Sequence, residues 1–249
     1  MTERAPRHPR DAWHQPRGRG HRHAPRRRTL SRDVIIAAAL RIVDRDGVDA
    51  VTMRAVADEL DTGAASLYAH VQDKDELLAA VFDHVLGDIV FDAVPDPKRW
   101  QEQIKEFSRT YVRVLTAHND LAKVSLGSIP TGSNGVRGME AMLSVLAASG
   151  LPGQVIGYAA DLLGQFVTVT AYETAVFAKN TGSPEDLAEF HHRLLTFFGS
   201  LSAIEFPTIT ALAPDLVQPD EAEDARFEFG LDIIVRGLAA HLPPKRRGA

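Results

Sequence analysis

The chain has 249 residues, enough for one large or two modest domains, and contains no cysteine, which excludes disulfide bonds and thiolate metal sites. No apolar run approaches the roughly 20 residues that a membrane-spanning helix needs. The first residues also lack the apolar stretch of a signal peptide, so we expect a cytoplasmic protein with no membrane partner.

The formal net charge of −5 conceals a strong asymmetry along the chain. Residues 1–28 hold nine Arg against Glu3 and Asp11, which gives +7 and leaves −12 for the remainder. Trp13 is the only large apolar side chain in this stretch of Pro, Gly, Arg and His, so we expect a disordered basic arm. Contact with DNA phosphates or a minor groove is one interpretation, and a solvated tail or a misassigned start is the other.

The first regular element is expected to begin after Ser31, whose hydroxyl suits a helix N-cap, with Asp33 in the first turn. An apolar stripe at helical spacing then runs to Asp46 and Gly47, where the helix should end. The stripe consists of Ile35, Ala38, Ala39, Ile42 and Val43.

Residues 52–78 predict two short helices around a tight turn, followed by the start of another helix. Asp61, Thr62 and Gly63 interrupt the apolar pattern, and Gly tolerates the backbone of a sharp turn. Asp73 with Glu76 three residues later is the pattern of a capping box. Two helices joined by such a turn form a helix-turn-helix, whose second helix can enter the major groove of DNA.

The residues of this stretch resemble the recognition-helix region of the tetracycline-repressor (TetR) family of bacterial transcription regulators. The resemblance lies in LYAHV followed by QDKDELL, at Leu67, Tyr68, His70, Val71, Lys74 and Leu77. It implies an all-α protein with a three-helix DNA-binding head over 29–75 and a larger ligand-binding and dimerisation domain over 76–242. Residues 243–249 are expected to form a flexible tail.

Two kinds of DNA contact are expected from the head. Arg54 and Lys74 open helices near the ends of the turn, where DNA phosphates pass, and small side chains on the second helix face the base edges. The candidate DNA-binding residues are Thr52, Arg54, Ala64, Ala65, Ser66, Tyr68, Ala69, His70 and Lys74.

Beyond the head, long helical patterns are separated by breaker-rich stretches. We expect helices over residues 74 to about 90, 98–118, 139–149, 154–179, 185–200 and 220–242. Loops are expected over residues 127–138 and 180–184, and an irregular segment over 207–219.

The helix over 154–179 is apolar nearly all round, which predicts burial on several sides and therefore a partner subunit. The last helix offers a second such surface. Its apolar residues are Phe227, Leu231, Ile234, Val235 and Leu238. In TetR-type proteins two helices of this half pack into a four-helix dimer bundle, so the resemblance implies a homodimer on a palindromic operator.

The C-terminal half also resembles the ligand domain of tetracycline repressors, in WQEQIKEFSRTY, HNDLAKVSLGSIPT and FGLDIIVRGL. Where those proteins hold a drug-bound Mg²⁺ and its polar edge with His, Asn and Arg, this chain has Ser125, Phe107 and Ile129, and Val90 replaces another His. Such side chains cannot desolvate a metal chelate favourably, so we expect no metal and no cofactor.

The expected effector is a small, largely hydrophobic molecule with a few hydrogen-bonding groups. The candidate ligand-binding residues are Val90, Phe91, Phe107, Tyr111, Ser125, Ile129, Phe166, Thr170 and Tyr172. Plain packing within the helical core is the alternative interpretation for each of them.

No phosphate-binding Gly loop, nucleophile elbow or zinc-protease motif is present, so we expect no catalytic residues and no enzyme. The function indicated is a ligand-released transcriptional repressor. A DNA-binding dimer without a ligand, and an α-helical enzyme or carrier with a structural helix-turn-helix, remain as alternatives.

Overall fold

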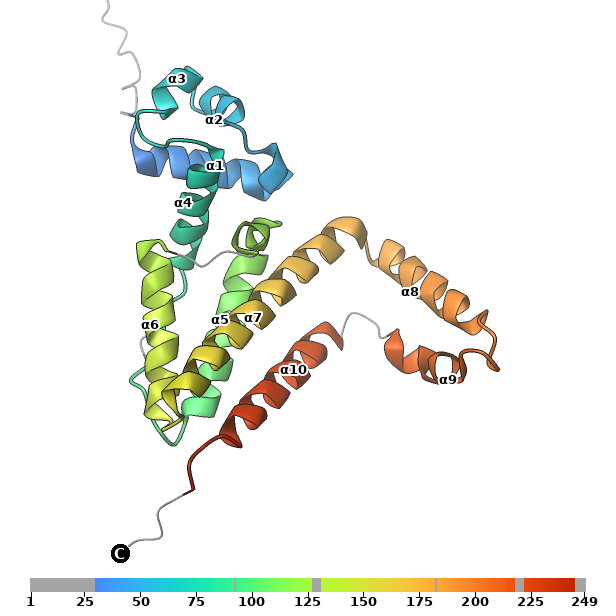
Figure 1. The fold of residues 1–249 in the computed structure, drawn as a ribbon. Helices are drawn as coiled ribbons and strands as arrows, with labels where there is room; N and C mark the ends of the chain where they lie inside the picture. The colour runs from blue at the N-terminus through green and yellow to red at the C-terminus, as the bar shows by residue number, and fades with distance from the viewer. Residues whose placement is uncertain (1–29, 92, 127–130, 182, 218–221, 245–249) are drawn as a thin grey trace, which may run out of the picture. The chain divides into compact units, whose positions relative to one another are not determined.

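The computed structural model describes residues 30–91, 93–126, 131–181, 183–217 and 222–244, all of them in helices or their connections (Figure 1). The all-α fold expected from the sequence is therefore confirmed, and no strand occurs in these ranges. The basic arm over 1–28, most of the tail and Ile129 lie outside the described residues. None of the helices in the described part of the chain is long and apolar enough to cross a membrane.

The head is built from α1 (Arg32–Asp46), the 3-10 turn η1 (Val48–Ala50), α2 (Met53–Glu59) and α3 (Ala64–Leu67). Ser31 caps α1, because its hydroxyl accepts the amide hydrogen of Val34 at 3.3 Å. Gly47 ends the helix with a φ of +86°, a backbone conformation that suits glycine. Both boundaries confirm the sequence prediction.

Helix α4 (Lys74–Leu86) begins at the expected capping box. Asp73 accepts the amide hydrogen of Glu76 at 2.8 Å, and the Glu76 carboxylate accepts that of Gln72 at 2.7 Å. The helix ends four residues before the expected Val90, which is 67% exposed. The prediction was wrong there because Gly87 and Asp88 favour a helix end over continuation.

Four elements follow and form the body of the C-terminal half. They are α5 (Trp100–Thr116), the 3-10 helix η2 (Leu121–Ser125), α6 (Ser133–Ala148) and α7 (Gly153–Thr181). The loop expected over 127–138 was wrong from residue 133 onwards, because α6 begins six residues before Met139. Its first turn contains glycine and is stabilised by a side chain from α4, as described below.

The chain ends with α8 (Pro184–Gly199), α9 (Pro207–Leu216) and α10 (Ala222–Ala239). Residues 207–216 were expected to be irregular, and that prediction was wrong. Pro207 occupies the first turn of α9, where proline's missing amide hydrogen has no helical partner to lose. Pro214 lies near the other end of the same short helix.

The last helix buries the apolar face that was expected to form a dimer surface. Leu231, Val235 and Leu238 join Trp100, Ile104 and residues of α6 and α7 in one core cluster, and Phe227 and Ile234 pack against it. Phe166 of α7 stacks on Phe227 with ring centroids 5.5 Å apart. The expectation that this face meets a partner is therefore corrected, since it belongs to the subunit's own core.

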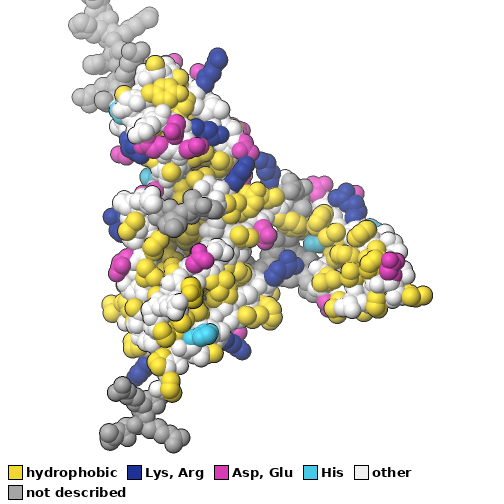
Figure 2. Space-filling model, in the orientation of Figure 1, with side chains coloured by type: hydrophobic (Ala, Val, Ile, Leu, Met, Phe, Trp, Pro, Cys, Tyr) yellow, Lys and Arg dark blue, Asp and Glu magenta, His cyan; other side chains and the backbone are white. Residues whose placement is uncertain are grey.

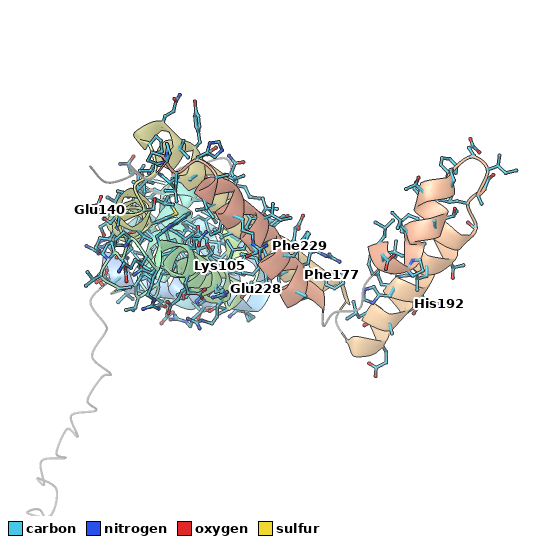
Figure 3. The ribbon with its side chains drawn as sticks, turned by 90° about the horizontal axis from the view of Figure 1, so that it is seen from below. Lys105, Glu140, Phe177, His192, Glu228 and Phe229 are labelled. Atoms are coloured by element: carbon cyan, nitrogen blue, oxygen red, sulfur yellow. The ribbon has the colours of Figure 1, made fainter. Side chains whose placement is uncertain are left out.

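Other apolar side chains remain exposed in the single chain. On α7 and α10 they are Tyr158, Leu162, Val169, Phe229 and Ile233, with Tyr158 and Phe229 both 68% exposed. Phe229 is labelled on α10 in Figure 3. A further group lies over α8 and α9, where hydrophobic side chains cover much of the visible surface (Figure 2).

The segment from His118 to Ser125, which includes η2, makes three polar contacts with the head. The buried carboxylate of Asp120 accepts the amide hydrogen of Val48 at 2.7 Å. Lys123 pairs with Asp49 at 2.8 Å, which lowers the pKa of that carboxyl, and His118 contacts Asp44 at 2.8 Å. The segment that ends at Ser125 therefore contacts the head directly.

Two ion pairs join α5 to α10, and one member of each, Lys105 and Glu228, is labelled in Figure 3. The Arg109 guanidinium donates two hydrogen bonds to Glu228, at 2.6 and 2.9 Å, and a third to Glu102 at 2.9 Å. Lys105 donates to Asp232 at 2.7 Å. Arg109 lowers the pKa of Glu228, and Lys105 lowers that of Asp232.

A lowered carboxyl pKa makes this junction sensitive to acid. The stabilisation is present above the ordinary Glu value of 4.5 and is lost as the pH falls through the lowered value in the folded protein. Solvent exposure limits the pair to about 1 kcal/mol or less. We expect Glu228→Gln to lower the thermal unfolding midpoint at pH 7 and to have progressively less effect as the pH falls below 4.5 and through the lowered pKa of the folded protein. Unfolding curves across this range test it, with Glu106→Gln, an exposed position on α5, as control. If the unfolding midpoint of Glu228→Gln were lowered by the same amount at every pH, the stabilisation could not come from the ionised Glu228 carboxylate.

Candidate functional site

The part of the head that is predicted to face DNA is formed by α2, α3 and the start of α4. The Thr52 hydroxyl caps α2 by accepting the Ala55 amide hydrogen at 3.0 Å, and its own proton remains available for a phosphate oxygen. The Arg54 side chain is 90% exposed and only 3.9 Å from the Asp58 carboxylate. Lys74 is half-buried at the first position of α4. Along the sequence, Thr52 and Arg54 precede α3 and Lys74 follows it.

Helix α3 buries one residue and presents several small ones. Leu67 is fully buried, whereas Tyr68 on the following turn is 55% exposed. Ala65, Ser66 and Ala69 are exposed, and Ala64 and His70 are half-buried. All nine residues predicted to contact DNA thus lie on the head, and their contacts with DNA stay predictions.

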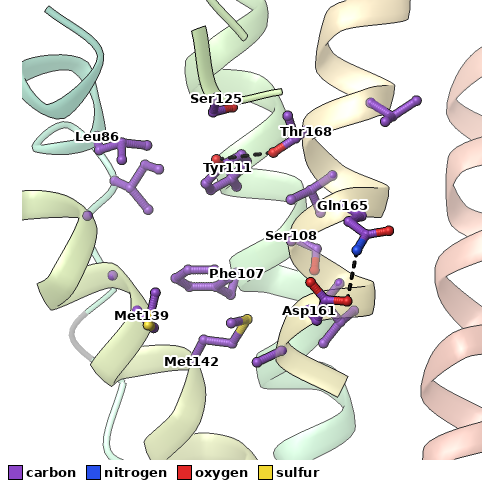
Figure 4. Close-up of a pocket in the computed structure, with 18 of the residues that line it drawn as sticks. Leu86, Phe107, Ser108, Tyr111, Ser125, Met139, Met142, Asp161, Gln165 and Thr168 are labelled. Carbon is purple, nitrogen blue, oxygen red and sulfur yellow. Dashed lines mark hydrogen bonds between the residues drawn. The ribbon is translucent and has the colours of Figure 1, made fainter. Parts of the chain in front are cut away.

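A cavity of about 710 Å³ lies among α4, α5, α6, α7 and η2 (Figure 4). Leu86 of α4 and Phe107, Ser108 and Tyr111 of α5 line it, together with Ser125 at the end of η2. From α6 the lining comes from Asn134, Gly135, Gly138, Met139 and Met142. Helix α7 contributes Asp161, Leu163, Gly164, Gln165, Val167 and Thr168 among others. This volume is within the ordinary range for pockets that bind small organic molecules.

Three of the predicted ligand residues, Phe107, Tyr111 and Ser125, line this cavity. Phe91 does not line it but packs edge-on against Phe107, with centroids 5.5 Å apart. The remaining described candidates lie elsewhere: Val90 is exposed, Phe166 stacks on Phe227, Thr170 donates to the Phe166 carbonyl at 2.8 Å, and Tyr172 is half-buried outside the lining.

The polar groups at one end of the cavity form a small hydroxyl cluster (Figure 4). The Tyr111 hydroxyl lies 3.4 Å from the Thr168 hydroxyl, and either can donate. Burial raises the pKa of Tyr111, and hydrogen bonds to Thr168 and Ser125 lower it in part. The Ser125 hydroxyl donates to the Ala122 carbonyl at 3.1 Å. Tyr111 therefore stays a neutral phenol at physiological pH.

Glycine makes room in the walls of the cavity. A Cβ atom at Gly138 of α6 or Gly164 of α7 would meet nothing within 4 Å, so both positions border open space. Glycine inside a helix is about 1 kcal/mol less favourable than alanine. Bulkier residues at either position would project into the cavity.

The start of α6 is capped from α4 rather than from its own N-cap residue. Asp83 accepts the amide hydrogens of Asn134 at 3.0 Å and Gly135 at 2.8 Å, and its backbone carbonyl accepts from the Asn134 side chain at 2.8 Å. Gly132, the N-cap residue, has no side chain, and a Cβ there would overlap Asp83. Two lining residues of the cavity are thus bonded directly to α4.

The sequence interpretation missed most of the lining from α6 and α7. Met139 and Met142 lie three residues apart on a helix that was expected, so their shared face could have been noted. On α7 the lining residues Asp161, Gly164 and Thr168 follow helical spacing, but the surrounding apolar residues hide that face.

Two family models match the chain. The model described as "Bacterial regulatory proteins, tetR family" matches residues 35–81, and the model "Tetracyclin repressor-like, C-terminal domain" matches residues 94–242. The first covers the helix-turn-helix, and the second covers α10 and all the described lining residues of the cavity except Leu86 and Ile89.

Individual relatives agree with the family models. An HTH-type transcriptional regulator of Saccharopolyspora erythraea is 31% identical over 85% of each chain. The HTH-type transcriptional repressor DrrR1 of Streptomyces coeruleorubidus is 29% identical over 88% of this chain and 81% of its own. The structure of Streptomyces coelicolor ActR in complex with actinorhodin superimposes with a TM-score of 0.79 at 41% identity, over 87% of this chain and 99% of that one.

Proposed function

Because the chain belongs to the TetR family of bacterial transcription regulators, we propose that it is a homodimeric repressor released from its operator by a small, largely hydrophobic molecule. The observation that carries the proposal is the cavity itself. Its lining is mainly apolar, and it includes Leu86 of α4, the helix that begins beside the DNA-reading α3.

Helix α4 supplies the link between ligand and DNA. Its first residue follows α3 closely, and its last turn borders the cavity through Leu86. An effector that binds better when α4 is displaced must weaken operator binding by the same factor. A coupling of about 1–3 kcal/mol would be ordinary for such a link. The Asp83 contact gives α6 a second way to move the same helix.

A homodimer is supported by the apolar side chains left exposed on α7 and α10. Tyr158, Leu162 and Phe229 are large and at least 48% exposed in the single chain. Exposed patches of this kind mark surfaces for association. Two heads held in one dimer would read two half-sites roughly 34–36 Å apart, so the proposed operator is palindromic.

The proposed effector is organic and does not require a metal. Phe107 and Ser125 line the cavity. By the sequence resemblance, they occupy positions where tetracycline repressors have residues that hold the drug and its Mg²⁺. Phe107 has no donor atom for a metal, and the neutral Ser125 hydroxyl, which already donates to the Ala122 carbonyl, is too weak a ligand to replace the waters that Mg²⁺ holds tightly. The structure of ActR with actinorhodin, a relative at 41% identity, supports an organic ligand for this fold.

The proposal is tested on DNA from the region upstream of the chain's own gene. Footprinting locates the protected sequence, and apolar candidate molecules are then titrated against the complex with and without Mg²⁺. Release of the operator by a metal-free molecule would support the proposal. Release that required Mg²⁺ would contradict a metal-free pocket. Absence of any protected DNA sequence would contradict the proposed role as a transcription regulator.

The DNA contacts proposed for the head separate positioning from base reading. Ala65, Ser66 and Ala69 offer little bidentate hydrogen bonding, so thymine methyl groups, close approach and DNA shape should carry much of the discrimination. The charged side chains beside them, Arg54 and Lys74, would contact phosphates and add affinity for every sequence.

Lys74→Ala is expected to weaken binding to operator and unrelated DNA by a similar factor. Removing one phosphate contact should flatten the slope of log affinity against log salt by about one unit. Fluorescence anisotropy across a salt series measures both, and Lys98→Ala, far along the chain from the head, is the control. A changed base preference in Lys74→Ala would show that the phosphate assignment is wrong.

A further inference from the structure

No cationic side chain is found among the described residues that line the cavity, and Arg137 of α6, close by, is exposed and already donates a hydrogen bond to the Asn134 side chain at 2.6 Å. Among its described lining residues only Asp161 carries a charge, and its carboxylate accepts a hydrogen bond from Gln165 at 2.8 Å (Figure 4). Residues 127–130, which follow the lining residue Leu126 in the sequence, have no charged side chain. A ligand in this cavity would therefore find no cationic side chain among the lining that the structure describes.

The positive end of α6, which borders the cavity, is already occupied by a carboxylate. The start of α6 contributes Asn134 and Gly135 to the cavity, and a helix N-terminus attracts negative charge. The Asp83 carboxylate occupies it, accepting both amide hydrogens. A ligand carboxylate would meet this second negative charge instead of two free donors.

Hydroxyl protons are also scarce in the cavity. Ser125 donates to the Ala122 carbonyl and Ser108 to the Ile104 carbonyl at 2.9 Å. One further proton is used between Tyr111 and Thr168. The cluster can therefore offer a ligand at most one hydroxyl donor, but several oxygen acceptors remain.

From these observations we infer that the cavity selects uncharged molecules that carry a hydroxyl group and excludes their carboxylic acids. An ionised carboxylate buried without a cation or several donors is strongly disfavoured. A ligand hydroxyl, in contrast, can donate to Ser125, Thr168 or Tyr111. The inference rests on the proposed ligand site, and it names the chemical class that the site accepts.

The test compares two probes of nearly equal shape, 2-(hydroxymethyl)anthraquinone and anthraquinone-2-carboxylic acid, within a small set of such tricyclic alcohol and acid pairs. Binding to the full chain is measured by calorimetry or fluorescence quenching, without DNA. Wild-type protein should bind the alcohol about 100-fold or more tightly than the acid at pH 7. Equal or tighter binding of the acid would overturn the inference, as would failure to bind any neutral member of the set.

Gly138 allows a gain-of-function variant. Gly138 lines the cavity and a Cβ there meets nothing within 4 Å, so an arginine at this position can direct its side chain into the cavity. Gly138→Arg should tighten binding of the acid by about tenfold or more relative to its effect on the alcohol. Gly138→Met, similar in size but uncharged, should weaken both probes alike. If Gly138→Arg and Gly138→Met changed the ratio of alcohol affinity to acid affinity equally, the inference would also be overturned.

The outcome can be separated from that of the proposed repressor function. A preference for the alcohol without any effect on operator binding would uphold the charge selection and contradict ligand-controlled release. Operator release by the acid form would contradict the charge selection and support ligand-controlled release.

Discussion

Phe107→Asp is expected to remove the response to the effector and to leave operator affinity close to that of the wild type. Phe107 is 6% exposed, lines the cavity and contacts the rings of Phe91 and Tyr111. A carboxylate there would be desolvated by any apolar ligand, which should lower effector affinity by about 100-fold or more. The measurement is an operator-binding titration with and without effector.

Two companion variants keep this result interpretable, because a buried Asp can also unfold the protein. Phe107→Leu retains an apolar wall and should retain the response. Gly164→Leu fills the cavity from α7 without adding charge, and it should remove the response while the helix itself gains from the loss of glycine. Effector-driven release that persisted in both Phe107→Asp and Gly164→Leu would place the ligand site elsewhere.

Asp83→Ala is expected to reduce the coupling between effector and DNA by about tenfold while the effector still binds. The carboxylate joins α4 to the first turn of α6, whose residues border the cavity. Without it α6 can respond to a ligand and leave α4 in place. Loss of the cap should also lower the free energy of unfolding by roughly 0.5–2 kcal/mol.

The coupling is measured as the ratio of operator affinities with and without saturating effector. Asp83→Asn keeps one oxygen acceptor and should lie between wild type and Asp83→Ala, and His84→Ala, at the exposed neighbouring position, is the control. An unchanged ratio in Asp83→Ala would show that Leu86 and the rest of α4 carry the signal without this contact.

The helix ends that the sequence predicted correctly are those capped by residues close to them in the chain. Ser31, the Asp73 and Glu76 pair and Gly47 act on amide groups within a few residues of themselves, so their effect is visible in the sequence. The start of α6 could not be predicted in this way. Its cap comes from Asp83, about fifty residues earlier in the chain, and the glycines of its first turn suggested a loop.

The candidate site shows the same division. Phe107 and Ser125 were found through a resemblance that fixes their places along the chain, and Tyr111 was chosen for its hydroxyl group. On α7 the aromatic and hydroxyl residues Phe166, Thr170 and Tyr172 were chosen by type, yet the cavity borders the face of Asp161 and Thr168. A helix that is apolar nearly all round gives no periodic signal for which face meets which neighbour.

The buried bond between Asp120 and the Val48 amide has a consequence for protein engineering. Transferring the head alone onto another regulator, with a junction near residue 75, would separate this donor from its acceptor. In the chimera the Val48 amide would be left without its acceptor, a defect worth about 1–3 kcal/mol if it stays buried. Chimeric regulators made from this chain therefore need a recipient whose segment matching 118–123 carries the same acceptor, and operator specificity can be exchanged only together with that segment.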